Sequence, residues 1–107
     1  MKAGALRERL TIERFAGRET NDLGEVAETW TTLREMRAQL VEQIAGESSE
    51  ASGVAASASL TFRMRFVAGL TVADRVRHAG RVLDIAEIRE LGRRGGQEIR
   101  CTVRGLA

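Results

Sequence analysis

Two side chains could take part in nucleophilic chemistry, His78 and Cys101, and each residue type occurs once in the chain. A nucleophile of this kind becomes reactive when a base such as histidine lies beside it. No motif accompanies them, because the sequence contains no G-x-S-x-G, C-x-x-C, H-E-x-x-H or P-loop pattern. Cys101 lies in an alternating segment and is expected to be a small buried residue. His78, close to an expected hairpin, is expected at the surface or at a sheet edge.

Pairs of carboxylates could serve as a general acid and a general base. The sequence offers Asp74 with Asp84 and Glu87 with Glu90, but such pairs arise by chance among 15 acidic residues. We expect these carboxylates to meet arginines on the solvent face. A single cysteine and a single histidine also exclude an internal disulfide and a multi-cysteine zinc site. The sequence therefore predicts no enzyme, no catalytic residue, no metal site and no cofactor.

Arginine supplies almost all of the positive charge. Of 17 basic residues only Lys2 is a lysine, and the formal net charge is +2. Arginine suits paired contacts with carboxylates across interfaces and contacts with phosphates, and a GC-rich genome also raises its frequency. Because 15 acids are interspersed with the arginines, a dedicated nucleic-acid binder is not expected.

Nucleic-acid binding would require a basic stripe, ideally with aromatic side chains that stack on bases. Three places are basic enough to consider: Arg63 with Arg65, Arg75 with Arg77, and Arg93 with Arg94. Phe62 and Phe66 alternate with Arg63 and Arg65, so they are expected on the opposite, core-facing side of their strand. The sequence therefore predicts no stacking platform and at most loose contact with DNA, without sequence specificity.

Alternating polar and apolar residues predict that β-strands carry these side chains. The expected strands are residues 6–15, 26–33, 36–43, 60–67, 74–78, 81–90 and 98–104. Residues 33–44 also fit a helix, since Leu33, Met36, Leu40 and Ile44 fall at helical spacing. A strand is preferred there because of the family resemblance described below.

Turn signals separate these strands. Asn21-Asp22-Leu23-Gly24 predicts a turn, because Asn and Asp bond their own backbone and Gly adopts positive φ without steric cost. Residues 79–80 predict a tight hairpin, residues 92–96 a flexible loop, and residues 70–74 a short turn or one helical turn. Residues 45–58 are mostly small and bury little apolar area. A segment of that length is usually functional or disordered.

The chain of 107 residues is expected to form one mainly β domain over residues 1–107, a small β-barrel or sandwich with a long loop at about residues 45–58. Trp30, the only tryptophan, would bury about 150–250 Å² and is expected to anchor the core or, alternatively, to face a neighbouring subunit. No apolar run is long enough for a membrane helix, and charges appear too early for a signal peptide. Synthesis in the bacterial cytoplasm and no membrane partner are expected.

Several segments, taken in order, resemble the bacteriophage head–tail joining proteins. Residues 21–30 resemble a pattern of that family, roughly D-x-x-G-x-x-x-x-x-W, and residues 6–13 resemble its opening strand, L-R-x-R-I/L-x-I. Residues 37–51 are similar to its next strand and to the G-x-E that opens its long loop. Residues 63–71 and 74–85 are similar to its later strand and hairpin. The resemblance covers nearly the whole chain, although residues 45–58 lack the larger apolar and Gln-rich residues frequent in the family.

The resemblance implies a small β-barrel that assembles as a homo-oligomeric ring in the neck of a phage, prophage or gene transfer particle. The ring would join the portal or adaptor protein to the tail terminator or another tail protein, and DNA would pass through it. The long loop would project toward the channel and close it, as in members called stoppers. The implied channel residues are Gly46, Glu47, Ser48, Ser49, Glu50, Ala51, Ser52 and Gly53.

A ring also needs contacts between subunits. The candidate interface residues are Trp30, Arg63, Arg65, Arg93 and Arg94, which could face acidic edges such as Glu25, Glu28, Glu87 and Glu90. Two alternatives stay open: a small nucleic-acid-binding barrel, and another ring of the same neck, such as the tail terminator or the adaptor.

Overall fold

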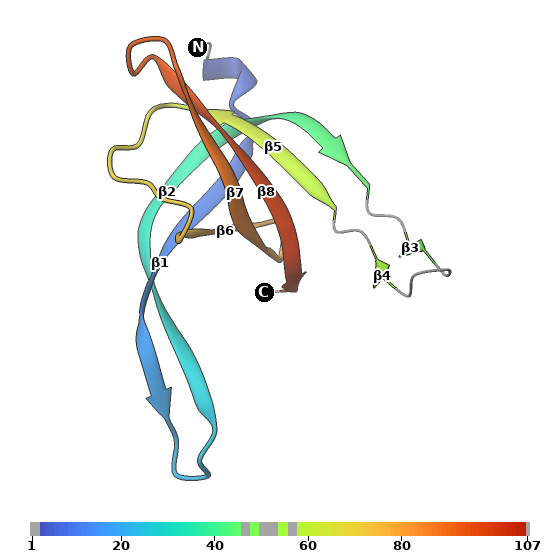
Figure 1. Ribbon diagram of the computed structural model, residues 1–107. Helices are drawn as coiled ribbons and strands as arrows, with labels where there is room; N and C mark the ends of the chain where they lie inside the picture. The colour runs from blue at the N-terminus through green and yellow to red at the C-terminus, as the bar shows by residue number, and fades with distance from the viewer. Residues whose placement is uncertain (1–2, 46–47, 50–53, 56–57, 107) are drawn as a thin grey trace.

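Six antiparallel strands form a closed barrel in the computed structural model, which describes residues 3–45, 48–49, 54–55 and 58–106 (Figure 1). A 3-10 helix η1 (Ala3–Ala5) precedes the barrel strands, which are β1 (Glu8–Thr20), β2 (Val26–Ile44), β5 (Ser59–Met64), β6 (Arg75–His78), β7 (Arg81–Leu91) and β8 (Gly96–Leu106). Their order around the barrel is β1-β2-β5-β8-β7-β6, and β1 pairs with β6 to close it. Two short strands, β3 (Ser48–Ser49) and β4 (Val54–Ala55), form a separate small sheet. In the part of the chain described, no helix is long and apolar enough to cross a membrane.

Alternation of side chains builds the core, as the sequence predicts. Every second residue of a strand points inward, and in the barrel these residues meet in one cluster. Its largest fully buried members come from five strands: Leu10, Ile12, Leu60, Phe62, Met64, Val76, Leu83, Ile99 and Cys101. The buried, unpaired state expected for Cys101 is confirmed.

The thiol of Cys101 is not a nucleophile at neutral pH. Burial, together with the nearby Asp84 carboxylate, raises the pKa of Cys101 to about 12. The thiolate is the reactive form of cysteine, so a pKa this high leaves the side chain as a packing group.

The second strand differs from the prediction. The sequence suggests two strands, residues 26–33 and 36–43, but β2 is one strand of 19 residues. Continuous pairing with β1 carries it across the expected gap, since Ile12 pairs with Arg34 and Thr11 with Glu35. The helical alternative for residues 33–44 is therefore wrong, because cross-strand pairing outweighs the local spacing of apolar residues.

The end of the central strand also differs. β5 ends at Met64, three residues before the predicted end, and the chain turns there. Val67 rather than Phe66 enters the core, and its backbone N–H donates to Gln97 Oε1 at 2.7 Å. Phe66 is partly exposed and lies under the Arg94 guanidinium, 5.4 Å from the ring centre. The segment at residues 70–74 is a turn and not a helical turn.

His78 is buried, contrary to the expected surface or edge position. It follows Val76 on the inner face of β6, and its ring packs edge-on against Phe62 with the centroids 5.0 Å apart. The Nε2 atom lies 3.3 Å from a carboxylate oxygen of Glu8. Alternate residues of β6 point into the barrel, and His78 is two residues after the buried Val76. Its side chain is therefore buried although it is polar.

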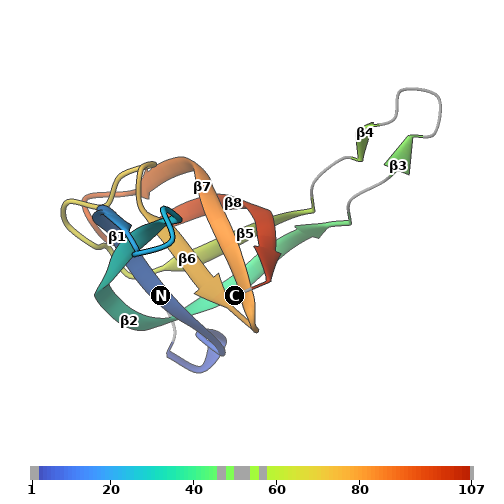
Figure 2. The same ribbon diagram turned by 90° about the horizontal axis from the view of Figure 1, so that it is seen from below.

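Two ribbons continue beyond the barrel. β1 loses its contact with β6 after Glu13, and from Arg14 onward it pairs only with β2. The resulting two-stranded ribbon of residues 14–31, here called the arm, leaves the barrel at one end (Figure 1). The other end of β2 runs with β5 away from the barrel toward β3 and β4 (Figure 2).

Replacing Phe62 with alanine is expected to lower the free energy of unfolding by about 3–5 kcal/mol, because the side chain is fully buried. Phe15→Ala is the matched control: Phe15 is 42% exposed and packs against Trp30, so a loss of about 0.5–1.5 kcal/mol is expected. Urea titrations followed by circular dichroism measure both values. Equal losses would contradict the placement of the core inside the barrel.

Candidate assembly surfaces

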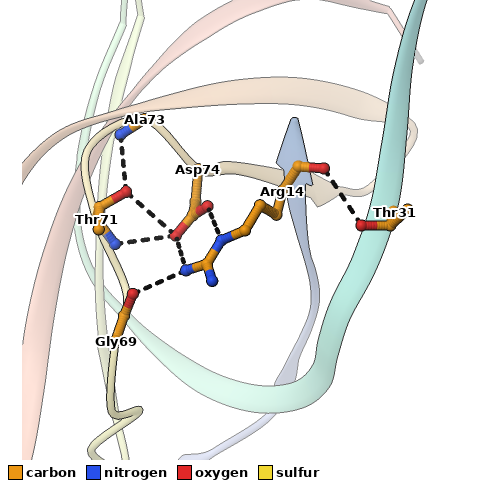
Figure 3. Close-up of polar contacts among 6 residues, drawn as sticks. All are labelled: Arg14, Thr31, Gly69, Thr71, Ala73 and Asp74. Carbon is orange, nitrogen blue, oxygen red and sulfur yellow. Dashed lines mark hydrogen bonds and ion pairs between the residues drawn. The ribbon is translucent and has the colours of Figure 1, made fainter. Parts of the chain in front are cut away.

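An ion pair between a half-exposed arginine and a buried carboxylate fixes the base of the arm (Figure 3). Arg14, the first residue of the arm, donates from Nε to Asp74 Oδ1 at 2.9 Å and from Nη2 to Asp74 Oδ2 at 3.1 Å. The same Nη2 also donates to the Gly69 carbonyl at 2.8 Å. Asp74 accepts a further bond from the Thr71 backbone N–H at 2.9 Å, and its side chain is only 2% exposed. Arg14 thus holds the arm to the loop between β5 and β6.

The environment of Asp74 favours its charged form. Burial alone would raise the pKa of Asp74, but the hydrogen bonds from Arg14 and Thr71, with the attraction of the Arg14 charge, outweigh it and hold the pKa below its ordinary value. Arg14 and Asp74 are 60 residues apart, so sequence spacing alone could not reveal this pair.

Trp30 lies at the same base and not in the core. Its ring packs edge-on against Phe15 with the centroids 5.6 Å apart. The Arg75 guanidinium lies 4.1 Å from the Trp30 ring centre and that of Arg104 lies 5.7 Å away. Trp30 is half-buried, so the expected core anchor is wrong. Its buried indole N–H has no acceptor among the described residues.

The tip of the arm is a tight, self-contained turn, as predicted. The Asn21 side-chain oxygen accepts bonds from the backbone N–H groups of Leu23 and Glu25, each at 2.9 Å. Gly24 adopts φ of 81°, which a residue with a side chain rarely does. Nothing in the turn covers its apolar residues, and Leu23 is 83% and Val26 63% exposed.

The arginines proposed for an interface occupy different parts of the surface. Arg63 is engaged inside the chain, where its Nη2 donates to Glu98 at 3.0 Å. Arg89 bonds the other Glu98 oxygen, and these contacts hold the pKa of Glu98 below its ordinary value despite burial. Arg65 is exposed. Arg93 and Arg94 are exposed at the turn between β7 and β8.

The candidate channel residues fall mostly outside the described residues: Gly46, Glu47, Glu50, Ala51, Ser52 and Gly53. The remaining two, Ser48 and Ser49, form β3, and they pair with Ala55 and Val54 of β4. The part of the long loop that is described therefore has a short antiparallel ladder, which the sequence did not indicate.

The carboxylates considered for catalysis mostly meet arginines, as expected. Asp84 is bound by Arg104, and Glu87 lies 3.3 Å from Arg100, whereas Glu90 has no such partner in the described part of the chain. Across the described residues, no group of three or more His, Cys, Asp or Glu could hold a metal ion. These paired charges can bind and orient a protein surface, but they do not form an acid–base pair.

One groove was not predicted, and it lies beside β1 and β2 on the barrel. Its volume is about 300 Å³, and its apolar lining comes from Leu6 and Met36. Arginines from three segments surround it and its adjoining depression: Arg9, Arg34, Arg37 and Arg65. Leu6, Met36 and these four arginines are here called the basic groove. Arg9 and Arg37 lie opposite each other in the register of β1 and β2 and share one face of the sheet, whereas Arg34, three residues from Arg37 in the same extended strand, lines the groove from the other face.

A closed antiparallel barrel with a projecting arm and a charged groove defines a small β-barrel assembly protein. The chain belongs to the phage head completion protein family, whose model matches residues 1–104. This confirms the resemblance to the head–tail joining proteins, and the chain is a structural protein of the virion that acts where the head is completed. No curated protein sequence matches the chain.

Two solved structures share the fold. Protein SF1141 from Shigella flexneri 2a is 25% identical, with a TM-score of 0.62 over 97% of both chains. A chain of the virion of a native gene transfer agent particle is 21% identical, with a TM-score of 0.59 over 94% of this chain and 96% of that one. At that identity the second likeness shows the barrel fold alone.

Asp74→Asn is expected to lower the free energy of unfolding by about 1–3 kcal/mol at pH 7, because the amide loses the charge-assisted bonds from Arg14. Since the folded-state pKa of Asp74 is lowered, this stability is present above the ordinary carboxyl pKa of about 3.9 and is lost as the pH falls through the folded-state value. The gap between wild type and variant should therefore close in acid. Unfolding followed by the fluorescence of Trp30 at several pH values measures it.

The matched control is Asp22→Asn at the exposed turn of the arm, where a change within about 0.5 kcal/mol is expected. A gap between wild type and Asp74→Asn that stays constant from neutral to acid pH would contradict the charged role of Asp74.

Proposed function

We propose that this protein forms a homo-oligomeric ring in the neck of a phage-like particle. The ring joins the portal or adaptor protein on the head side to the tail terminator or another tail protein. The family assignment supports the location. The observation that carries the ring is the arm, whose turn exposes Leu23 and Val26 although the barrel has a closed core of its own.

The barrel favours contacts of a particular kind. No strand of the closed barrel is an edge strand over its whole length, although the arm and residues 85–91 of β7 each leave one strand edge without a partner among the described residues. Rings arise when one surface of a subunit meets a different surface of the next. An arm that projects from one end of a barrel supplies such an unlike surface. Trp30, with its unpartnered indole N–H at the arm base, and the exposed Arg65, Arg93 and Arg94 remain interface candidates within this proposal.

The segment between β2 and β5 would face the DNA channel. β2 and β5 pair as far as Ile44 with Ser59, so they hold the two ends of this segment side by side and away from the barrel. Small residues at positions 45–58 would let several copies meet near one axis, and Glu47 and Glu50 would repel DNA phosphates. DNA would then pass, or be held back, without sequence-specific contact.

Deleting the gene from a particle-producing strain is expected to leave heads and tails unjoined, because no ring connects them. Electron microscopy of purified particles counts tailed and tailless heads, and a plasmid copy of the gene should restore the tailed form. Cryo-electron microscopy of the restored particles should place this chain between portal and tail. An unchanged yield of tailed particles without the gene would overturn the proposal.

The channel segment can be tested separately. Replacing residues 46–57 with Asn-Gly should close a two-residue hairpin on β2 and β5, because Ala45 and Ala58 directly follow and precede the paired residues Ile44 and Ser59. Tailed particles are expected to form, but with less DNA retained per particle, as measured by the ratio of DNA to protein. A control replaces only residues 79–80 with Asn-Gly at the turn between β6 and β7, where both residues already adopt positive φ. Full DNA retention with the shortened loop would remove the gate from the proposal.

The alternative of a nucleic-acid-binding barrel receives less support from the charges. Arg63, Arg75 and Arg77 each lie within 4 Å of a carboxylate of the same chain, which neutralises part of two of the three predicted basic stripes, while Arg65 forms no ion pair among the described residues. Binding to DNA that weakens with salt at a slope of about −0.9 per phosphate contact would favour this alternative. The other neck rings, tail terminator and adaptor, are not the family that matches.

A further inference from the structure

The outer part of the arm is acidic, and within the described residues its carboxylates form no ion pair, although Glu28 lies opposite Arg18 in the strand register. Residues 18–28, here called the arm tip, hold one base, Arg18, against four acids: Glu19, Asp22, Glu25 and Glu28. The arm tip therefore carries −3 while the whole chain carries +2, so the rest of the chain carries +5. In the described part of the chain, none of these four acids forms an ion pair.

Most acids of the barrel, by contrast, form ion pairs within the chain. Its carboxylates Glu13, Asp74, Asp84, Glu87 and Glu98 each lie beside an arginine of the same chain. Among the described residues the barrel acids Glu35, Glu42 and Glu90 form no ion pair either, but the arm tip gathers four such acids in one segment, next to the exposed apolar side chains of Leu23 and Val26. A two-stranded ribbon is at best marginally stable alone in water, and in the described part of the chain this one pairs with no third strand beyond its base.

The basic groove has the opposite character. Its four arginines, Arg9, Arg34, Arg37 and Arg65, form no ion pair within the described residues, and Glu35 is the single acid beside them. The groove thus carries +3 over a floor of Leu6 and Met36. In sign, in size of charge and in apolar content it complements the arm tip.

The groove also contains an unfavourable contact that an acidic partner would relieve. Arg9 of β1 lies directly opposite Arg37 of β2 in the strand register, and both are exposed. Like charges at directly opposed positions destabilise an antiparallel pair. Arg65 adds a third charge next to them, because it follows Met64, the residue paired with Ala38.

We propose that the arm tip of one copy docks in the basic groove of the next copy around the ring. Leu23 and Val26 would cover the floor of Leu6 and Met36, and the acids of the arm tip would pair with the groove arginines. This inference rests on the ring proposed above and assigns its subunit contact. The two surfaces differ, as a closed ring requires.

A copy cannot use its own arm in this way. Arg37 lies eleven residues along β2 from Val26, the first residue after the turn, and the strand is extended between them. At about 3.3 Å per residue the separation is about 36 Å. The groove that receives the arm must therefore belong to another molecule.

Reversing the charges of the arm tip and of the groove, first separately and then together, tests whether the two surfaces bind each other. One variant carries Glu19→Lys with Glu25→Lys in the arm, and a second carries Arg37→Glu with Arg65→Glu in the groove. Arg63 is left unchanged, because it pairs with Glu98 inside the barrel. Each variant should reduce the yield of tailed particles from a gene-deleted strain by about tenfold or more, which corresponds to about 1.4 kcal/mol.

Combining the two variants distinguishes a loss of docking from damage to the fold. The four changes in one chain should return the yield to within about threefold of wild type, since a basic arm then meets an acidic groove. Co-expression of the two variants should do the same, because alternating copies satisfy every contact. The control Glu42→Lys reverses a charge at an exposed barrel position outside both surfaces and should have little effect. Failure of both combinations to restore, with all variants folded by circular dichroism, would overturn the proposal.

A cross-link identifies the occupant of the groove. Tailed particles carrying Leu23→Cys with Arg37→Cys, treated with a short bis-maleimide, should give dimers and higher multimers of this chain. Cys101 does not interfere, because it is fully buried. Val72→Cys in place of Leu23→Cys is the control, since Val72 is also an exposed apolar side chain but lies outside the arm tip. Links from position 23 to a different neck protein would overturn the proposal and leave the ring intact.

The ring and the contact between arm tip and groove can be tested independently of each other. If tailed particles lacked this chain, the ring would be wrong, and the same cross-link on the concentrated purified chain would decide whether arm and groove recognise each other. Multimers through positions 23 and 37 would support the contact, and their absence would overturn it.

Discussion

The short pairing that closes the barrel is the constraint on which the rest of the structure depends. β1 and β6 meet over three residues only, Thr11–Glu13 with Arg75–Arg77. The pairing of β1 with β6 is reinforced by the buried carboxylate of Glu13. It accepts a hydrogen bond from Arg75 Nε at 2.8 Å, and its other oxygen lies 3.7 Å from Arg77 Nη1. Without this seam β1 and β6 would be exposed edges, and the core between them would open to water. A contact of three residue pairs thus decides whether the chain is a barrel or an open sheet.

The seam also decides where the arm begins. Immediately after Glu13 the chain carries Arg14, and immediately before Arg75 it carries Asp74, so the pair that fixes the arm is the direct continuation of the seam. Arg75 serves both, since it bonds Glu13 and covers the Trp30 ring. Closure of the barrel and orientation of the arm are therefore one structural unit. The free acids of the arm tip and the free arginines of the groove lie on opposite sides of that unit, which is why one copy cannot join them.

The local sequence pattern is sufficient to predict the structure where side chains alternate between the two faces of a strand. Phe62 and Cys101 were placed in the core by alternation, and the turn at Asn21 by its own hydrogen-bonding chemistry. The pattern was insufficient where a distant residue decides. Trp30 lies at the arm base, where it packs against Arg75 and Arg104 instead of entering the core, and Arg63 pairs with Glu98, 35 residues away. The basic groove depends on the register of β1 against β2, which no spacing within either strand reveals.

The continuity of β2 determines how the protein would carry a pulling force. β2 is a single curved strand of 19 residues from the arm to the base of the channel segment, with a path length of about 60 Å at 3.3 Å per residue (Figure 1). A pull along its axis would load the hydrogen bonds to β1 and β5 in shear, all at once, instead of peeling them apart in sequence. A tensile force between the arm and the loop would therefore be carried by one continuous strut, and the core of the barrel would bear little of it.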